Sequence, residues 1–177
     1  MINQLLNDHK INETEIFNLL SSMSENGSDY SDLFFQHSIA ESSVLDEGIV
    51  KDGSYNITHG VGARCVSGDQ TGFSYSDDLN LKAIQGAVDF AKGISNHKSN
   101  KPPKILKSTS YPSKYAAISP LDSLSSEQKV DMLRQIDSMA RKEPKVVQVN
   151  ASLSGAYTEV LIASTDGVYQ VDCRPMV

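Results

Sequence analysis

The sequence predicts an α+β fold in which an antiparallel sheet of hairpins packs against three main helices. Residues 30–40 place apolar side chains at alternate positions, which is the period of a strand with one buried face. Residues 79–94 repeat apolar side chains at helical spacing, which indicates a helix that covers the sheet. Short glycine-containing segments separate the strand-like runs, and connections this short join antiparallel neighbours.

The first helix is expected over Asn12–Asn26, because apolar side chains recur at helical spacing behind Asn12. Glu15 lies three residues after Asn12, as in a capping box. Gly27 follows at the position where a chain commonly leaves a helix in a left-handed conformation. The apolar side of this helix comprises Ile16, Leu19, Leu20 and Met23.

A strand over Tyr30–Ala40 comes next, and residues 44–51 lead from it to Asp52-Gly53. That dipeptide readily adopts the positive φ angles of a tight hairpin turn, so residues 54–67 are expected to form the return strand. The first strand should turn Leu33, Phe35, His37 and Ile39 to one face, and Phe34, Gln36 and Ser38 to the other.

Gly60 and Gly62 weaken the return strand and predict a bulge or a close approach of two backbones. A second hairpin over residues 68–72 brings back residues 73–75 as a third strand. An exposed edge of such a sheet can bind an extended peptide through main-chain hydrogen bonds. Most sheet edges are only protected from aggregation, so both interpretations stay open.

The second helix carries the clearest apolar stripe in the chain, with Ser76, Asp77 and Asp78 as candidate caps. The prolines between residues 98 and 124 exclude a continuous element there. A short strand near residues 104–106 or a 3₁₀ turn at Pro120-Leu121 would still fit. The stripe of the helix comprises Leu79, Ala83, Ile84, Ala87, Val88, Ala91 and Ile94.

The third helix begins at Ser125, has Gln128 as the partner in a capping box, and ends near Arg141 before Pro144. Its apolar stripe comprises Val130, Leu133, Ile136 and Ala140.

Residues 146–153 and 157–164 are expected to form another hairpin, and Asp166-Gly167 turns the chain into a last strand over residues 168–171. An offset of 114 residues places the first helix on the third and Asp52-Gly53 on Asp166-Gly167. This pattern indicates either a structural repeat or a coincidence of ordinary element lengths.

The domain organisation follows from these elements. A helix–meander–helix unit over residues 1–97, a proline-containing connection over 98–124 and a helix–hairpin unit over 125–177 are expected within one compact domain. At 177 residues the chain can bury a conventional core without disulfides.

Composition limits the possible partners and compartment. A formal charge of -6 and a pI near 5.1 argue against nucleic acid. Cys65 and Cys173 are too few for a disulfide framework, which indicates buried free thiols. No leader-like segment and no run near 18 apolar residues occurs, so we expect a soluble cytoplasmic protein with no membrane partner.

No catalytic or metal-binding set is visible in the sequence. A zincin presents two histidines and a glutamate on one helix as HExxH, and that pattern is absent. The four histidines show no pair at i, i+4, so we assign no catalytic residue, no metal ligand and no bound cofactor to this chain. Arg64 lies in an apolar strand, where a buried charge would require a paired carboxylate.

A collinear series of segments resembles the amino-terminal part of the TldD/PmbA family of zinc metallopeptidases. The segments follow the family order with similar spacing and span nearly the whole chain, which makes the resemblance specific. They are residues 29–36, 49–57, 60–64, 71–75, 119–122, 151–155, 165–167 and 172–175.

The resemblance implies a cytoplasmic bacterial metallopeptidase that works as a heterodimer with a PmbA-like subunit, also called TldE. The family cleaves unfolded peptides, including peptide-antibiotic precursors and an antitoxin, and carries the older label of modulator of DNA gyrase. This chain would be an amino-terminal domain that helps to build the substrate groove and the subunit contacts.

The zinc motif of the family lies beyond the matched region, so zinc is expected in the complete parent protein and not in this chain. We therefore expect a truncated portion that is inactive alone. The alternative is a stand-alone, non-catalytic module that binds peptides or proteins.

Overall fold

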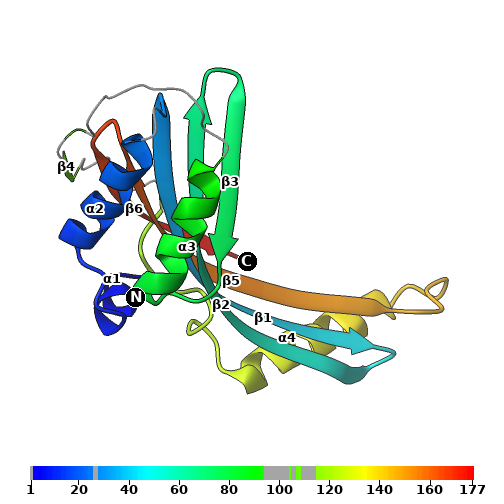
Figure 1. Cartoon of the computed structure of the whole chain (residues 1–177). Helices are drawn as coiled ribbons and strands as arrows, with labels where there is room; N and C mark the ends of the chain where they lie inside the picture. The colour runs from blue at the N-terminus through cyan, green and yellow to red at the C-terminus, as the bar shows by residue number, and fades with distance from the viewer. Residues whose placement is uncertain (1, 26–27, 94–103, 105–106, 109–114) are drawn as a thin grey trace. The chain divides into compact units, whose positions relative to one another are not determined.

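The computed structural model describes residues 2–25, 28–93, 104, 107–108 and 115–177. The predicted α+β class is confirmed: the described residues form one six-stranded sheet in the order β3-β2-β1-β5-β6-β4, together with four helices (Figure 1). The sheet is antiparallel except for β4, which pairs in parallel with β6. The elements are α1 (Ile2–Asp8), α2 (Glu13–Ser24), β1 (Tyr30–Asp46), β2 (Ile49–Ser67), β3 (Gln70–Ser76), α3 (Leu81–Lys92), β4 (Lys107–Ser108), α4 (Ser126–Ala140), β5 (Asn150–Ser164) and β6 (Val168–Met176).

Contacts divide the chain into two compact units, and four of the strands contribute residues to both. Unit 1 comprises Met1–His37, Thr58–Ser113 and Glu159–Asp172, and unit 2 comprises Ser38–Ile57, Lys114–Thr158 and Cys173–Val177. Each unit is therefore built from three separate segments of the chain. The division into residues 1–97, 98–124 and 125–177 stays a prediction.

Unit 1 has a continuous apolar core between its helices and one face of its strands. Helices α2 and α3 contact each other and lie on the sheet (Figure 1). Burial of each large apolar side chain contributes roughly 1.5–3 kcal/mol, so this cluster dominates the stability of the unit. Its members include Ile2, Ile16, Leu20, Met23, Leu33, Phe35, Val61, Ala63, Ile84, Val88 and Leu161.

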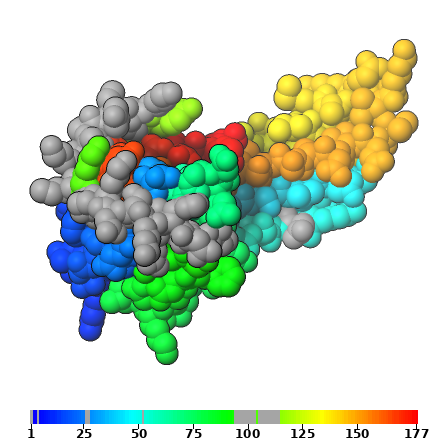
Figure 2. Space-filling model, turned by 45° about the horizontal axis from the view of Figure 1, so that its top comes forward, coloured from blue at the N-terminus to red at the C-terminus, as the bar shows by residue number. Residues whose placement is uncertain are grey.

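Unit 2 has fewer buried apolar side chains than unit 1, and two charged side chains, Lys129 and Asp137, are buried with them. Helix α4 turns Lys129, Leu133 and Asp137 inward, whereas Ile136 is 48% exposed. The predicted apolar stripe of this helix is thus wrong at Ile136, because charged partners on β1 and at the helix end hold the polar side inward. Figure 2 shows α4 (yellow), β5 (orange) and the β1–β2 hairpin (cyan) at the surface. The buried apolar residues described in unit 2 are Leu45, Leu121, Leu133, Val149 and Tyr157.

The predicted N-cap residue is the observed one in two of the three predicted helices. The Asn12 side chain caps α2 by accepting from the Glu15 amide, and Ser125 and Gln128 form a complete capping box on α4. On α3 the cap is Asn80 and not Ser76, Asp77 or Asp78, because the helix begins only at Leu81. Helix α1 was not predicted, since seven residues are too few for a periodic signal.

The hairpin between β1 and β2 turns at Glu47-Gly48, with φ of 53° and 75°, and not at Asp52-Gly53. The predicted turn is wrong because the Asp-Gly dipeptide lies inside β2. Gly68 and Gly167 have positive φ where the other two turns were expected, which confirms those turns.

The helix–strand–strand order of α2-β1-β2 recurs as α4-β5-β6. The register of 114 residues fails, however, because Gly167 lies in a turn and Gly53 in a strand.

Strand β5 is one continuous strand, which contradicts the predicted hairpin over residues 146–153 and 157–164. Gly155 is at its middle, where a Cβ would lie 2.9 Å from Leu121 Cδ2. This glycine therefore permits close packing instead of a turn. Three contacts keep one antiparallel register between β1 and β5: Ser31 with Thr165, Ser38 with Thr158, and Glu47 with Val149.

Some of the predicted features cannot be compared with the structure. Gly27, Ile94 and most of the connection 98–124 lie outside the described residues. The Ser123 amide donates to the Pro120 carbonyl at 3.2 Å, which is the i→i+3 hydrogen bond of the turn predicted at Pro120-Leu121.

Candidate functional site

A pocket of about 400 Å³ lies in unit 1 on the sheet face opposite the helices. Strand alternation places its residues there, because Leu33 and Phe35 of β1 point into the core and Phe34 points away. The register continues the same face across the sheet, with Gly62 opposite Tyr75 and Arg64 opposite Phe73. The polar residues that line the pocket are Gln36, Thr58, His59, Ser76 and Asp77.

Two glycines form the floor of this pocket. A Cβ at Gly62 would lie 3.2 Å from Phe73 Cε2, so the Phe73 ring leans over the glycine backbone. A Cβ at Gly60 would lie 2.9 Å from the Ser76 carbonyl oxygen. The close approach of two backbones is confirmed at Gly60, whereas the close neighbour of Gly62 is a side chain, the Phe73 ring.

Three aromatic side chains, Phe34, Phe73 and Tyr75, line the pocket over this floor. Phe73 and Tyr75 are 58% and 77% exposed, which is unusual for side chains of that size. The sequence analysis did not select these aromatics, because they look like ordinary strand residues until the register of β2 and β3 is known. Tyr75 and Phe73 lie two residues apart on β3, and that spacing is the signal that could have found them.

An ion pair accompanies the pocket on the same face. Arg64 donates through Nε to Asp32 at 3.0 Å and also through its Nη2. The guanidinium lies 5.6 Å from the centroid of the Tyr30 ring. The bonds to Asp32 raise the pKa of Arg64, and burial together with Asp32 raises the pKa of Tyr30. The carboxylate partner expected for Arg64 is therefore present.

The outer side of β2 is open next to the pocket. Strand β3 pairs with β2 only over Val61–Ser67. Gly60 lies against the backbone of Ser76 and Asp77, which follow β3. Thr58 and His59 continue the strand beyond it, and no strand among the described residues pairs with them on that side. An unpaired strand segment of this kind can accept an extended chain.

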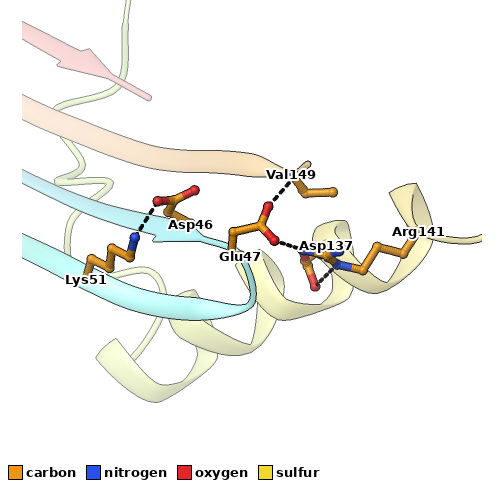
Figure 3. A network of polar contacts seen from close by, with 6 residues as sticks. All are labelled: Asp46, Glu47, Lys51, Asp137, Arg141 and Val149. Carbon is orange, nitrogen blue, oxygen red and sulfur yellow. Dashed lines mark hydrogen bonds and ion pairs between the residues drawn. The ribbon is translucent and has the colours of Figure 1, made fainter. Parts of the chain in front are cut away.

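A polar network in unit 2 has a structural role (Figure 3). Glu47 accepts from the Val149 amide at 3.2 Å and pairs with Arg141 at 3.4 Å. Arg141 also donates to both carboxylate oxygens of Asp137, at 3.0 and 3.1 Å. These contacts join the hairpin tip to α4 and β5, and the paired groups hold one another in place, so we interpret the network as structural.

The histidines and cysteines show no catalytic arrangement. Burial raises the pKa of the Cys65 thiol, which opposes thiolate formation, and Cys173 is only half-buried. Burial lowers the pKa of His37; the Glu159 carboxylate opposes this shift and His59 adds to it. Among the described residues, no three His, Cys, Asp or Glu side chains are grouped to hold a metal ion. No helix in the described part is long and apolar enough to cross a membrane.

The sequence matches two family models and several known proteins. Residues 31–95 match the model of PmbA/TldA metallopeptidase domain 1, and residues 119–177 match that of the PmbA/TldA metallopeptidase central domain. The chain is similar to a metalloprotease TldD homolog of Haemophilus influenzae, with 43% identity over 99% of this chain and 37% of the relative. A metalloprotease TldD homolog of Buchnera aphidicola is 40% identical over 98% of this chain and 36% of its own length.

Two solved structures share the fold. A putative modulator of a DNA gyrase from Thermotoga maritima matches with a TM-score of 0.70 and 16% identity, over 92% of this chain and 37% of the other. TldE from Thermococcus kodakarensis matches with a TM-score of 0.65 and 15% identity, over 90% and 37%. The chain thus spans little more than a third of the length of the curated relatives that it matches.

Proposed function

Because the chain belongs to the PmbA/TldD metallopeptidase family, we propose that it is the amino-terminal part of a peptidase of this family and holds unfolded peptides for cleavage. The observation that supports this role is the unpaired edge at Thr58 and His59 beside the aromatic pocket. An edge strand binds an extended main chain with little sequence preference, and a pocket on the sheet face takes one of its side chains. Unfolded peptides, including antitoxins and peptide-antibiotic precursors, have such free main chains.

The hydrolytic step is assigned to residues outside this chain. A catalytic zinc requires three protein ligands and an open fourth position. The described residues do not provide such a set, so they do not fit a zinc ion. This chain would contribute peptide binding, and zinc would be held elsewhere in the parent protein.

Peptide binding can be tested directly on this chain by NMR titration with a capped, uncharged, unstructured peptide. A copy of the peptide with N-methylated amides is the control, because it cannot donate to the β2 edge. We expect the N-methylated peptide to bind at least tenfold more weakly. Equal binding of the two peptides, or no binding, would contradict the proposal.

A pair of glycine variants tests the position of the bound peptide. Gly62→Leu fills the pocket, whereas Gly86→Leu places the same side chain on α3, where a Cβ at Gly86 has no neighbour within 4 Å. We expect only Gly62→Leu to weaken binding, with circular dichroism showing that both variants fold. Loss of binding in both variants, or in neither, would place the peptide elsewhere.

The assignment of catalysis can be tested by peptidase assays with added zinc. We expect this chain alone to leave an unfolded peptide intact, and a full-length TldD-type protein that contains it to cleave the peptide when mixed with a PmbA-like subunit. Cleavage by this chain alone would show a catalytic site within these residues.

We also propose that α4 contacts the partner subunit. Met132, Ile136 and Met139 recur at helical spacing and are 41%, 48% and 66% exposed. An exposed apolar row of this kind is typical of an interface. Ile136→Lys should weaken association with a TldE-like subunit in sedimentation experiments, whereas Gln135→Lys, which adds the same charge beside the row, should not. Equal effects of the two substitutions would contradict this contact.

A further inference from the structure

We propose that the aromatic pocket of unit 1 binds a cationic side chain, lysine or arginine, of the extended peptide. This inference rests on the proposed function and adds a side-chain preference to it. The pocket combines three aromatic rings with one carboxylate, Asp77, over a floor of glycine backbone.

The aromatic rings favour a cation. The faces of Phe34, Phe73 and Tyr75 carry partial negative charge and attract an ammonium or guanidinium group. Lysine and arginine also have long apolar stems that can lie along rings and backbone while the charged head reaches the rim. A volume of about 400 Å³ is ample for one such side chain.

The charge of the pocket favours the same occupant. Asp77 is the one acidic side chain among the described residues that line the pocket, and no lysine or arginine lies among them. It has no hydrogen-bond or ion-pair partner among the described residues, whereas Asp32 on the same face is paired with Arg64. An incoming cation would therefore meet a free carboxylate and no competing lysine or arginine, on a chain whose formal charge is -6.

The same face already contains this type of recognition within the chain. Arg64 lies 5.6 Å from the centroid of the Tyr30 ring and pairs with Asp32. Ring and carboxylate thus hold one guanidinium between β1 and β2. The pocket offers the same two groups, Tyr75 and Asp77, without a cation of its own among the residues that line it.

The test is an NMR titration of this chain with four capped peptides of identical uncharged sequence, differing only at one central residue. That residue is lysine, arginine, norleucine or phenylalanine. Norleucine keeps the apolar stem of lysine and lacks the charge. We expect the lysine and arginine peptides to bind about fivefold more tightly than the norleucine peptide, with shifts at Gly62 and Tyr75 and weaker binding at high salt.

Two pairs of variants locate the effect. Asp77→Asn should remove most of the advantage of lysine over norleucine, and Asp69→Asn, the same change at an exposed acid in the β2–β3 turn, should leave it intact. Tyr75→Leu should lower binding of the cationic peptides, whereas Phe90→Leu, at a 71% exposed aromatic on α3, should not.

The outcomes separate this inference from the proposed function. If norleucine or phenylalanine binds as well as lysine, or Asp77→Asn changes nothing, the cationic preference is wrong although peptide binding stands. If none of the four peptides binds, the proposed function fails as well.

Discussion

The helices of unit 1 bury mainly apolar side chains, whereas the helix of unit 2 buries two charged side chains beside Leu133 and leaves three apolar ones exposed. In unit 1, α2 and α3 contribute Ile16, Leu20 and Ile84 to the core, each at 0% exposure. In unit 2, α4 buries Lys129 and Asp137 and exposes Met139 at 66%. The two units take different segments of the long strands, so the comparison is between two helix sets, each with its own strand segments.

This difference indicates two modes of stabilisation. An apolar core tolerates some change in geometry, because its attraction is roughly proportional to buried area and has no direction. Ion pairs require a specific geometry, and removal of one partner leaves a buried charge or carbonyl unsatisfied. Unit 2 is therefore expected to have a well-defined arrangement with a small margin of stability, and to gain stability when its exposed apolar row is covered.

The largest effect is expected from the core of unit 1. Phe35→Ala removes a ring that is 1% exposed and should lower the free energy of unfolding by about 3–5 kcal/mol. Phe90→Ala deletes the same ring from a 71% exposed position and should change it by less than about 0.5 kcal/mol. Urea denaturation followed by circular dichroism measures both. Similar losses in the two variants would show that this core is not the main source of stability.

A smaller and more local effect is expected from Lys129→Met in unit 2. The Lys129 ammonium donates to Glu41 and, at 2.6 Å, to the Leu121 carbonyl, and both acceptors would lose their donor. We expect a loss of about 2–3 kcal/mol. Hydrogen exchange should then accelerate within residues 38–57 and 114–158 and remain slow in the core of unit 1.

Two further variants test the cause of that loss. Lys129→Met combined with Glu41→Leu should recover part of it, because no unpaired carboxylate remains. Lys142→Met removes an exposed lysine just after α4 and should have little effect. Faster exchange throughout unit 1 in the Lys129 variant would show that the two units unfold together.

The network at the hairpin tip should contribute less. Arg141→Gln removes contacts to Glu47 and Asp137, yet the Arg141 side chain is 37% exposed and solvent screens the pairs. We expect a small loss of stability that shrinks as salt is added. Thermal unfolding at low and high salt measures it, and a loss that does not depend on salt would contradict an ionic contribution.

Local signals in the sequence predicted the structure best. The caps at Asn12 and Ser125 depend on residues within one helical turn, and both are confirmed. The turn at Glu47-Gly48 could not be predicted in this way. Glu47 is held in a left-handed conformation by Val149 and Arg141, which are about a hundred residues away in sequence, and these contacts override the turn preference of Asp52-Gly53.

In the candidate site, too, local features were predictable and contacts between distant residues were not. Gly60 and Gly62 indicated a close backbone approach from sequence alone, and the structure confirms it at Gly60. The spacing of Phe73 and Tyr75 places them on one face of β3, but their convergence on Phe34 and the glycines depends on the pairing of Gly62 with Tyr75. Alternation gives the face of each residue within one strand, whereas the register between strands decides which residues meet.

The smallest expected effect concerns pH and unit 1. Burial lowers the pKa of His37, and its Nδ1 atom has no hydrogen-bond partner in the described structure. The folded protein therefore favours the neutral imidazole, whereas the unfolded chain takes up a proton near the ordinary pKa of about 6.5. Stability from this residue is complete above that pH and is lost as the pH falls through it toward the lower folded pKa. In urea denaturation between pH 7.5 and 5, His37→Gln should flatten this loss, whereas His9→Gln, at an exposed position, should not. An unchanged pH profile in His37→Gln would assign the acid sensitivity to other groups.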